Sequence, residues 1–181
     1  MGKGLDKNII LAEKIRAGDQ EAFEKLFHKY YARLCVFSNS FVKSLDISRD
    51  VVQDVFIKIW DNRDNFYVKQ SLKAYLYQAV RNQSLNFLQQ KKQKERLEER
   101  IKKQYEASEE IHGDELNTEE LTAKVWKLVE TLPERRRTIF ILYRKHGLSY
   151  NEIAEVMSIA RKTVENQMGK SLQYLRENLE L

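Results

Sequence analysis

Apolar side chains recur at steps of three and four residues along most of this 181-residue chain, while residues that break helices are scarce. The chain has one proline and six glycines. Steps of three and four place side chains on one face of an α-helix, whereas many-stranded folds need frequent turn residues. We therefore expect an all-α protein. The stripe of residues 20–42 comprises Phe23, Leu26, Phe27, Tyr30, Leu34, Phe37 and Phe41.

Capping and breaking residues mark the ends of the predicted helices. Asp19, Ser48 and Ser71 each stand directly before one of the first three stripes. Their side chains can accept a hydrogen bond from an amide of the first helical turn. Pro133 suits a first turn, and Gly147 suits a left-handed helix end. The predicted helices span residues 20–42, 48–60, 72–88, 121–132 and 133–144.

The sign of the charge reverses about halfway along the chain. Residues 91–103 carry seven basic side chains against three acidic ones, and residues 104–123 carry seven acidic side chains and no Lys or Arg. Large apolar residues are sparse in the acidic stretch, so it cannot bury much surface. We expect two small helical domains, at residues 5–90 and 121–181, joined by a flexible charged linker at 91–120.

The second domain contains the pattern of a helix-turn-helix. Ser149 followed by Glu152 predicts a capping box at the start of one helix. Residues 158–160 form a three-residue turn, and a second helix runs over residues 161–178. The turn has serine and alanine at positions where glycine and a serine cap are common. This unit is used to place its second helix in the major groove of DNA.

The predicted second helix has an apolar and a polar side. The apolar side comprises Val164, Met168, Leu172, Leu175 and Leu179. Asn pairs with adenine, Glu accepts from cytosine, and Lys contacts guanine or phosphate. Gly169 costs about 1 kcal/mol relative to Ala inside a helix, which fits close approach to DNA. The alternative is an ordinary solvated face, but the helix-turn-helix context favours DNA reading. The polar side comprises Lys162, Glu165, Asn166, Gly169, Lys170, Gln173 and Arg176.

The predicted helix of residues 48–60 carries an acidic rim around an apolar side chain on its outward side. At about 100° per residue its polar positions fall within a narrow arc. An isoleucine inside such a rim suits the docking of a basic protein partner. The alternative is a solvated acidic face without a partner. The arc comprises Asp50, Gln53, Asp54, Ile57 and Asp61.

Six short segments have the order and spacing of a known family. They read GDQEAF (18–23), DVVQDVFIKIW (50–60), LYQAVRN (76–82), LPE (132–134), GLSY (147–150) and EIA (152–154). The first three resemble region 2 of the sigma-70 family of RNA polymerase sigma factors, and the last three resemble region 4. The likeness is to the extracytoplasmic-function subfamily, and it covers nearly the whole chain apart from the linker.

The resemblance implies roles for residues of the first domain. In the family, the face matching Asp50, Gln53 and Asp54 binds the clamp helices of core RNA polymerase, and the outward arc adds Ile57. The loop at about 61–70 captures a base flipped from the minus-ten element. Physical reasoning alone leaves the loop's two aromatic residues as either base-stacking groups or core anchors. The residues expected at minus-ten DNA are Phe66, Tyr67, Lys73, Arg81 and Asn82.

The resemblance also implies that the second domain reads the minus-thirty-five element. The matching base-reading positions are Glu165, Asn166, Gln167, Gly169 and Lys170, with Arg161, Lys162 and Thr163 near the DNA backbone. The acidic linker resembles the family's connector, which threads through the polymerase. The expected partners are core RNA polymerase, promoter DNA and an anti-sigma factor, which in this family is often membrane-anchored.

No constellation for catalysis or metal binding stands out in the sequence. The three histidines (His28, His112 and His146) lack metal-ligand spacing, Cys35 has no evident relay, and there is no Gly-rich phosphate loop. We expect no enzyme activity, no cofactor, no metal and no small-molecule substrate. Without a recognisable signal peptide or membrane span, the expected location is the cytoplasm. Two alternatives are a stand-alone helix-turn-helix regulator and a helical adaptor that binds no DNA.

Overall fold

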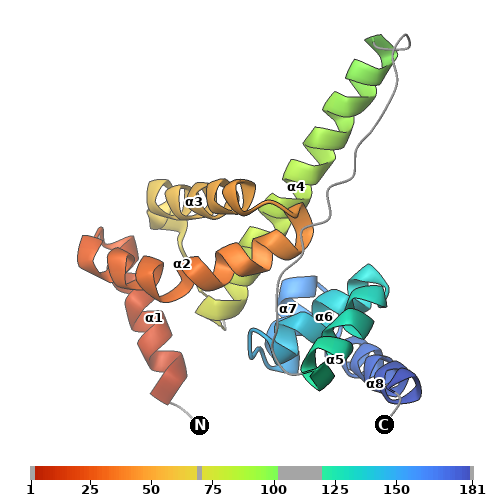
Figure 1. Cartoon of the computed structure of the whole chain (residues 1–181). Helices are drawn as coiled ribbons and strands as arrows, with labels where there is room; N and C mark the ends of the chain where they lie inside the picture. The colour runs from red at the N-terminus through yellow and green to blue at the C-terminus, as the bar shows by residue number, and fades with distance from the viewer. Residues whose placement is uncertain (1–2, 69–70, 102–119, 180–181) are drawn as a thin grey trace. The chain divides into compact units, whose positions relative to one another are not determined.

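The described part of the chain folds into helices that form two separate units (Figure 1). The computed structural model describes residues 3–68, 71–101 and 120–179, with side chains for residues 8–68, 71–95 and 124–179. Its regular structure is entirely helical, which confirms the all-α prediction. The first unit ends at Arg96 and the second begins at Leu97.

Unit 1 contains four α-helices and one short 3₁₀ helix. They are α1 (Lys3–Arg16), α2 (Gln20–Val42), α3 (Leu45–Asp61), η1 (Arg63–Asn65) and α4 (Leu72–Ile101), of which the part up to Arg96 belongs to this unit. α2 and α3 lie side by side (Figure 1) because only two residues connect them, and Lys43 at that turn has a left-handed φ of 56°. Aromatic rings fill the contact: Phe23 lies 4.9 Å from Trp60 and Phe27 lies 5.0 Å from Phe56, between centroids.

Two of the three predicted caps in unit 1 are confirmed, and one is wrong. Asp19 accepts a hydrogen bond from the amide of Ala22 at 3.0 Å, and Ser71 accepts one from Ala74 at 3.2 Å. The N-cap of α3 is Ser44, one turn earlier than predicted. Ser48 lies inside the helix, fully buried, where its hydroxyl donates to the carbonyl of Ser44 at 2.6 Å. A serine one turn into a helix can thus satisfy its hydroxyl locally.

A buried pair of hydroxyls joins α2 to α4. Ser38 and Ser84 are fully buried, with 3.0 Å between their oxygens. The Ser84 hydroxyl also lies 2.8 Å from the carbonyl oxygen of Val80, to which it donates its single proton. Ser38 is therefore the donor within the pair, since each hydroxyl carries one hydrogen. Around them the core is apolar, with Phe37 and Tyr77 packed at 5.0 Å.

α4 is longer than predicted. Its apolar stripe ends near Leu88, yet the helix continues to Ile101, so the first part of the predicted linker is helical. Residues 91–95 are all exposed, and Lys91 pairs with Glu95 at 3.7 Å. Lys, Gln, Glu and Arg are good helix formers without burial, which explains why the loss of apolar periodicity did not end the helix. The acidic stretch from 102 to 119 lies outside the described residues.

The described part of unit 2, from residue 120 on, forms four α-helices around a small apolar core. They are α5 (Glu120–Thr131), α6 (Glu134–Arg144), α7 (Tyr150–Met157) and α8 (Arg161–Asn178). α8 packs against the other three helices. Gly147 follows α6 with φ 63°, and its amide donates to the carbonyl of Tyr143, as the sequence predicted for the end of this helix. The fully buried core side chains include Ile139, Leu142, Ile153, Val156 and Val164.

One position of the predicted apolar side of α8 is wrong. Leu172 is 50% exposed, while Ser171 is fully buried and donates its hydroxyl to the carbonyl of Gln167 at 2.9 Å. Val164, Met168 and Leu175 are buried as predicted. The buried arc is centred on these three and includes position 171, so a serine bonded to its own helix occupies the place expected for a leucine.

Candidate protein and nucleic-acid interfaces

The outward side of α3 is a continuous surface with an apolar centre. Asp50, Gln53, Asp54 and Ile57 are all exposed, and Ile57 keeps 56% of its surface accessible. The predicted arc therefore exists, and we call these four residues the α3 face. The opposite side of the helix holds it in place through Val51, Val52, Val55, Phe56 and Ile59, which are all buried.

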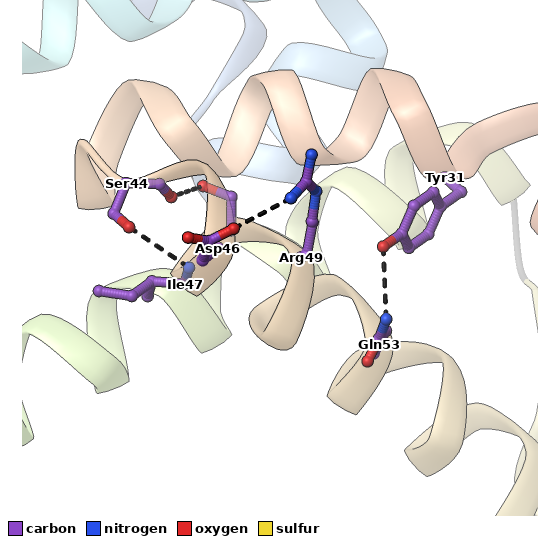
Figure 2. Close-up of polar contacts among 7 residues, drawn as sticks. Tyr31, Ser44, Asp46, Ile47, Arg49 and Gln53 are labelled. Atoms are coloured by element: carbon purple, nitrogen blue, oxygen red, sulfur yellow. Dashed lines mark hydrogen bonds and ion pairs between the residues drawn. The ribbon is translucent and has the colours of Figure 1, made fainter. Parts of the chain in front are cut away.

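Polar contacts order the first half of α3 (Figure 2). Ser44 caps the helix through the amide of Ile47 at 3.4 Å, and Arg49 pairs with Asp46 at 3.0 Å. Gln53 reaches across to α2, where its side-chain nitrogen lies 3.4 Å from the hydroxyl of Tyr31 (Figure 2). Tyr31 thus adjoins the α3 face. Sequence reasoning missed it because the contact joins residues 22 positions apart.

The α3 face is also linked to α4 through exposed side chains. Lys58 donates to the side-chain oxygen of Gln83 at 2.9 Å, and the side-chain nitrogen of Gln83 lies 3.4 Å from an oxygen of Asp54. Gln83 lies next to Asn82 in the sequence. These bonds place Gln83 against the α3 face, although solvent competes for each of these exposed bonds.

The two aromatic residues of the loop after α3 lie in different environments. Phe66 is only 3% exposed, and its ring packs edge-on against Tyr75 of α4 with centroids 5.3 Å apart. Tyr67 is 60% exposed. Phe66 has the environment of a core anchor, while Tyr67 has an accessible ring. Gln70, the last residue of the predicted loop, lies outside the described residues.

The three candidate DNA residues on α4 do not share one side of the helix. Lys73 and Arg81 are half-buried, and Asn82 is exposed. An α-helix turns by about 100° per residue, so Asn82 lies opposite Lys73, and Arg81 lies on the side nearer Lys73. Lys73 belongs to the first turn, close in sequence to the loop. Asn82 instead lies on the exposed side of α4.

The helix-turn-helix of unit 2 has the predicted geometry. Ser149 accepts from the amide of Glu152 at 3.3 Å, and the carboxylate of Glu152 accepts from the amide of Ser149 at 2.8 Å, which completes the capping box. Ser158 ends α7 with φ 52°, in the left-handed region. Ala160 is extended and gives α8 no side-chain cap. The turn thus closes through backbone geometry, although serine replaces the usual glycine.

The outward side of α8 carries both signs of charge. Arg161, Lys162, Asn166 and Lys170 are exposed, whereas Thr163, Glu165 and Gln167 are half-buried. Glu165 pairs with Arg161 at 3.0 Å and with Lys162 at 3.6 Å. Gln167 accepts a long hydrogen bond of 3.5 Å from Arg136 of α6, a residue that the sequence analysis did not single out. Such exposed pairs are weak and exchange readily for phosphate contacts.

Gly169 lies in the middle of this outward side, at a position where neither packing nor backbone conformation requires glycine. It is exposed, and a Cβ added there would meet no heavy atom within 4 Å. Its φ is not positive, so alanine fits the backbone. The fold of unit 2 therefore does not require glycine at this position. The outward side comprises Arg161, Lys162, Thr163, Glu165, Asn166, Gln167, Gly169 and Lys170, which we call the α8 face.

Burial raises the pKa of several side chains among the described residues. Burial raises the pKa of the Cys35 thiol, which disfavours the reactive thiolate. Burial, with smaller contributions from Tyr143 and Glu165, raises the pKa of Tyr150. No group of His, Cys, Asp or Glu within this part of the chain could hold a metal ion. None of the described helices is long and apolar enough to span a membrane.

The fold and faces define a class: a two-unit helical protein with a helix-turn-helix in one unit and an exposed acidic-apolar face in the other. Family models agree, since residues 26–94 match Sigma-70 region 2 and residues 122–175 match Sigma-70, region 4. The ECF RNA polymerase sigma-E factor of Escherichia coli K12 is 30% identical over 170 residues, covering 90% of this chain and 88% of that protein.

Two solved structures are similar in fold. CnrH, in complex with the cytosolic domain of CnrY, has a TM-score of 0.67 and 25% identity, covering 96% of this chain and 97% of that one. The sigma factor RpoE of Bartonella quintana, in complex with the anti-sigma factor NepR, has a TM-score of 0.62 and 25% identity, covering 88% and 97%. The chain belongs to the sigma-70 family, in its extracytoplasmic-function subfamily, and is a promoter-directing transcription initiation factor.

Proposed function

We propose that the α3 face binds core RNA polymerase and so delivers the two DNA-reading surfaces to a promoter. The observation that carries this proposal is the exposed Ile57 surrounded by Asp50, Gln53 and Asp54. Interfaces draw their affinity from a few central side chains, and charged neighbours give orientation and speed of association. In this proposal residues 5–90 act as region 2, residues 91–120 as linker and residues 121–181 as region 4.

At the minus-ten element, we assign base capture to the loop after α3 and phosphate or base contacts to α4. Unpairing a base costs a few kcal/mol, and stacking on an aromatic ring returns about 1–3 kcal/mol. The exposed Tyr67 is suited to stacking, and the buried Phe66 to anchoring the loop on Tyr75. Lys73 and Arg81 are suited to phosphates, and the exposed Asn82 to a base edge.

At the minus-thirty-five element, we assign base reading to the α8 face. Asn166 and Lys170 are exposed at neighbouring turns, and Gly169 leaves space between them. Arg161 and Lys162 lie exposed at the start of the helix, and their cationic side chains are suited to contacts with backbone phosphates. Glu165 holds both cations in the free protein, so DNA binding replaces these ion pairs with phosphate contacts.

With this function, the protein would act in the cytoplasm as a non-catalytic subunit with no cofactor of its own. RpoE of Bartonella quintana and CnrH are seen bound to an anti-sigma factor and to a cytosolic domain, respectively. By analogy we propose that an anti-sigma factor also binds this chain. Because the faces for polymerase and DNA are exposed in the free chain, an inhibitor can act simply by covering them.

The test is holoenzyme formation with core RNA polymerase purified from the same bacterium. Asp50 and Asp54 are exposed, so D50K/D54K leaves the fold intact but reverses the charge of the α3 face. We expect at least a ~100-fold loss of affinity, because reversed charges at an interface cost several kcal/mol. The matched control is E21K/E24K, which makes the same charge change at exposed positions of α2.

Two results would count against the proposal. Equal losses in D50K/D54K and E21K/E24K would show a response to net charge and not to the α3 face. Failure of the wild-type chain to bind core polymerase, combined with tight binding to a duplex on its own, would favour the stand-alone regulator. A stand-alone dimer would also prefer a palindromic site.

A further inference from the structure

α1 precedes the segment that matches the region 2 family model, yet it is built into unit 1. The match begins at residue 26. Ala12 is 4% exposed and Ile15 is fully buried, so the helix is docked. Gly18 turns the chain with φ 85°, and its amide donates to the carbonyl of Ile15 at 2.9 Å. Asp19 then caps α2, so the end of α1 has a fixed position.

The end of α1 lies against the loop that carries Tyr67. The guanidinium carbon of Arg16 lies 4.8 Å from the centroid of the Tyr67 ring. A Cβ at Gly18 would lie 3.9 Å from the Nε of Arg63 in η1. Arg63 itself donates to the carbonyl of Trp60 at 3.0 Å and lies over the Trp60 ring. The loop is therefore held by α1 as well as by α3 and α4.

This contact leaves Tyr67 oriented but accessible. Arg16 is half-buried and lies over one face of the ring, while Tyr67 keeps 60% of its surface exposed. A guanidinium stacks flat on an aromatic ring and is attracted to its electron-rich face. A ring already held on one face loses less freedom when a partner stacks on the other face. Arg16 thus lies over one face of the Tyr67 ring, and the exposed ring can accept a stacking partner on its other face.

We propose that Arg16 is a positioning residue for base capture: it holds the Tyr67 ring so that the open face stacks on an unpaired base of the minus-ten element. The inference rests on the proposed function and deepens it. It brings into promoter recognition a helix that precedes the matched region 2 segment. Arg16 acts through Tyr67, so its effect vanishes when Tyr67 is absent.

The test uses holoenzyme assembled from core polymerase and the full-length chain. The probes are single-stranded oligonucleotides enriched from a random pool by wild-type holoenzyme, with 2-aminopurine placed at each enriched position in turn. We expect quenching at one position, caused by stacking, and its loss in Y67A. R16A should weaken binding by about 5- to 10-fold and restore part of the fluorescence, because the ring is no longer held.

Two further variants separate positioning from charge and from folding. K14A removes one cation from an exposed site in the last turn of the same helix and should change affinity less than about twofold. R16K keeps the charge without the flat guanidinium and should fall between wild type and R16A. R16A/Y67A should bind no more weakly than Y67A, as expected when one residue acts through another.

The outcomes distinguish this inference from the function on which it rests. The role of Arg16 would be overturned if the losses of affinity caused by R16A and Y67A multiply in the double variant R16A/Y67A. It would also be overturned if R16A and K14A lose affinity equally. Unchanged quenching in Y67A, with promoters still opened by the holoenzyme, would overturn the inference and leave the proposed function standing. Failure of the wild-type chain to form holoenzyme with core polymerase would overturn both this inference and the proposed function.

Discussion

The two units each turn the polar side of one amphipathic helix outward, but these sides differ in kind. The α3 face has one large apolar side chain, Ile57, at the centre of an acidic surface. The α8 face has no such centre among its described residues and carries opposite charges that pair with one another, as Glu165 does with Arg161. The first has the anatomy of a protein interface, with an apolar centre and a charged rim. The second distributes polar contacts, as groove readers do.

This difference separates two ways of binding that are otherwise easy to confuse in a charged protein. An interface with an apolar centre concentrates its free energy in few residues. A face that neutralises phosphates spreads its free energy over many charges and weakens as salt rises. Affinity for polymerase and affinity for DNA should therefore respond to different substitutions and to salt in different ways.

Among single substitutions, the largest expected effect is at Ile57. I57K should weaken polymerase binding by about 30-fold or more, since truncating or charging a central interface residue costs about 2 kcal/mol or more. Leu45 offers a matched control, because it lies on the same helix and is also 56% exposed. Titration of labelled chain with core polymerase measures both, and equal effects of I57K and L45K would contradict a centre at Ile57.

On the α8 face, base contacts and phosphate contacts should separate. N166A should lose about 10-fold in discrimination between promoter and mutated minus-thirty-five DNA, in the range of one base contact. K162A should bind both DNAs more weakly and lower the slope of log affinity against log salt by about one, because Lys162 is an exposed cation at the position assigned to the DNA backbone. Holoenzyme binding at several salt concentrations measures both values. If the two variants change discrimination and salt slope equally, base contacts and phosphate contacts are not separated on the α8 face.

Gly169 should show opposite effects on stability and on DNA binding. G169A should raise the free energy of unfolding of unit 2 by up to about 1 kcal/mol, because alanine favours the helix and meets open space. It should weaken promoter binding, because the Cβ stands where DNA approaches. Q173A, at an exposed position one turn later, should leave promoter binding nearly unchanged. Denaturant unfolding in a W60F background, where Trp126 alone reports unit 2, measures stability. Unchanged promoter binding in G169A would refute close approach.

The smallest expected effect is a pH dependence of the stability of unit 1, caused by a buried tyrosine in its core. Burial, only partly opposed by Arg33, raises the pKa of Tyr77 in unit 1 from 10.0 to about 12. The unfolded chain then loses this proton at lower pH than the folded chain. The stability linked to it is complete below about pH 10 and falls as pH rises towards 12. In W126F, where Trp60 reports unit 1, unfolding midpoints should fall over this range, and by less when Y77F is added. An equal fall with and without Y77F would contradict the assignment.

Much of the fold follows from patterns that act within one helix. The stripe of residues 20–42, the capping box at Ser149 and the turn at 158–160 each depend on neighbours a few positions apart. The N-cap of α3 was misplaced because Ser44 and Ser48 both fit the local pattern, and only the left-handed Lys43 decides between them. Leu172 was misassigned for a similar reason, since packing by α5, α6 and α7 selects the centre of the buried arc.

The candidate surfaces were predicted where they lie on one helix and missed where they join two. The exposed positions of α3 and α8 follow from periodicity. The contacts of Tyr31 with Gln53, of Gln83 with Asp54 and of Arg16 with Tyr67 join residues far apart in sequence. Periodicity also cannot tell which of two adjacent loop aromatics is buried. Packing on Tyr75 buries Phe66 and leaves its neighbour exposed.

The Ser38–Ser84 pair has a consequence for how unit 1 meets its partners. If α4 rotated about its axis, the hydrogen bond between Ser38 and Ser84 would be lost inside an apolar core, at a cost of about 1 kcal/mol. One rotational setting of α4 against α2 is therefore favoured over its neighbours. We therefore expect Arg81 and Asn82 to have their orientation set when the chain folds, before any partner binds. In that case unit 1 meets its partners as a preformed scaffold.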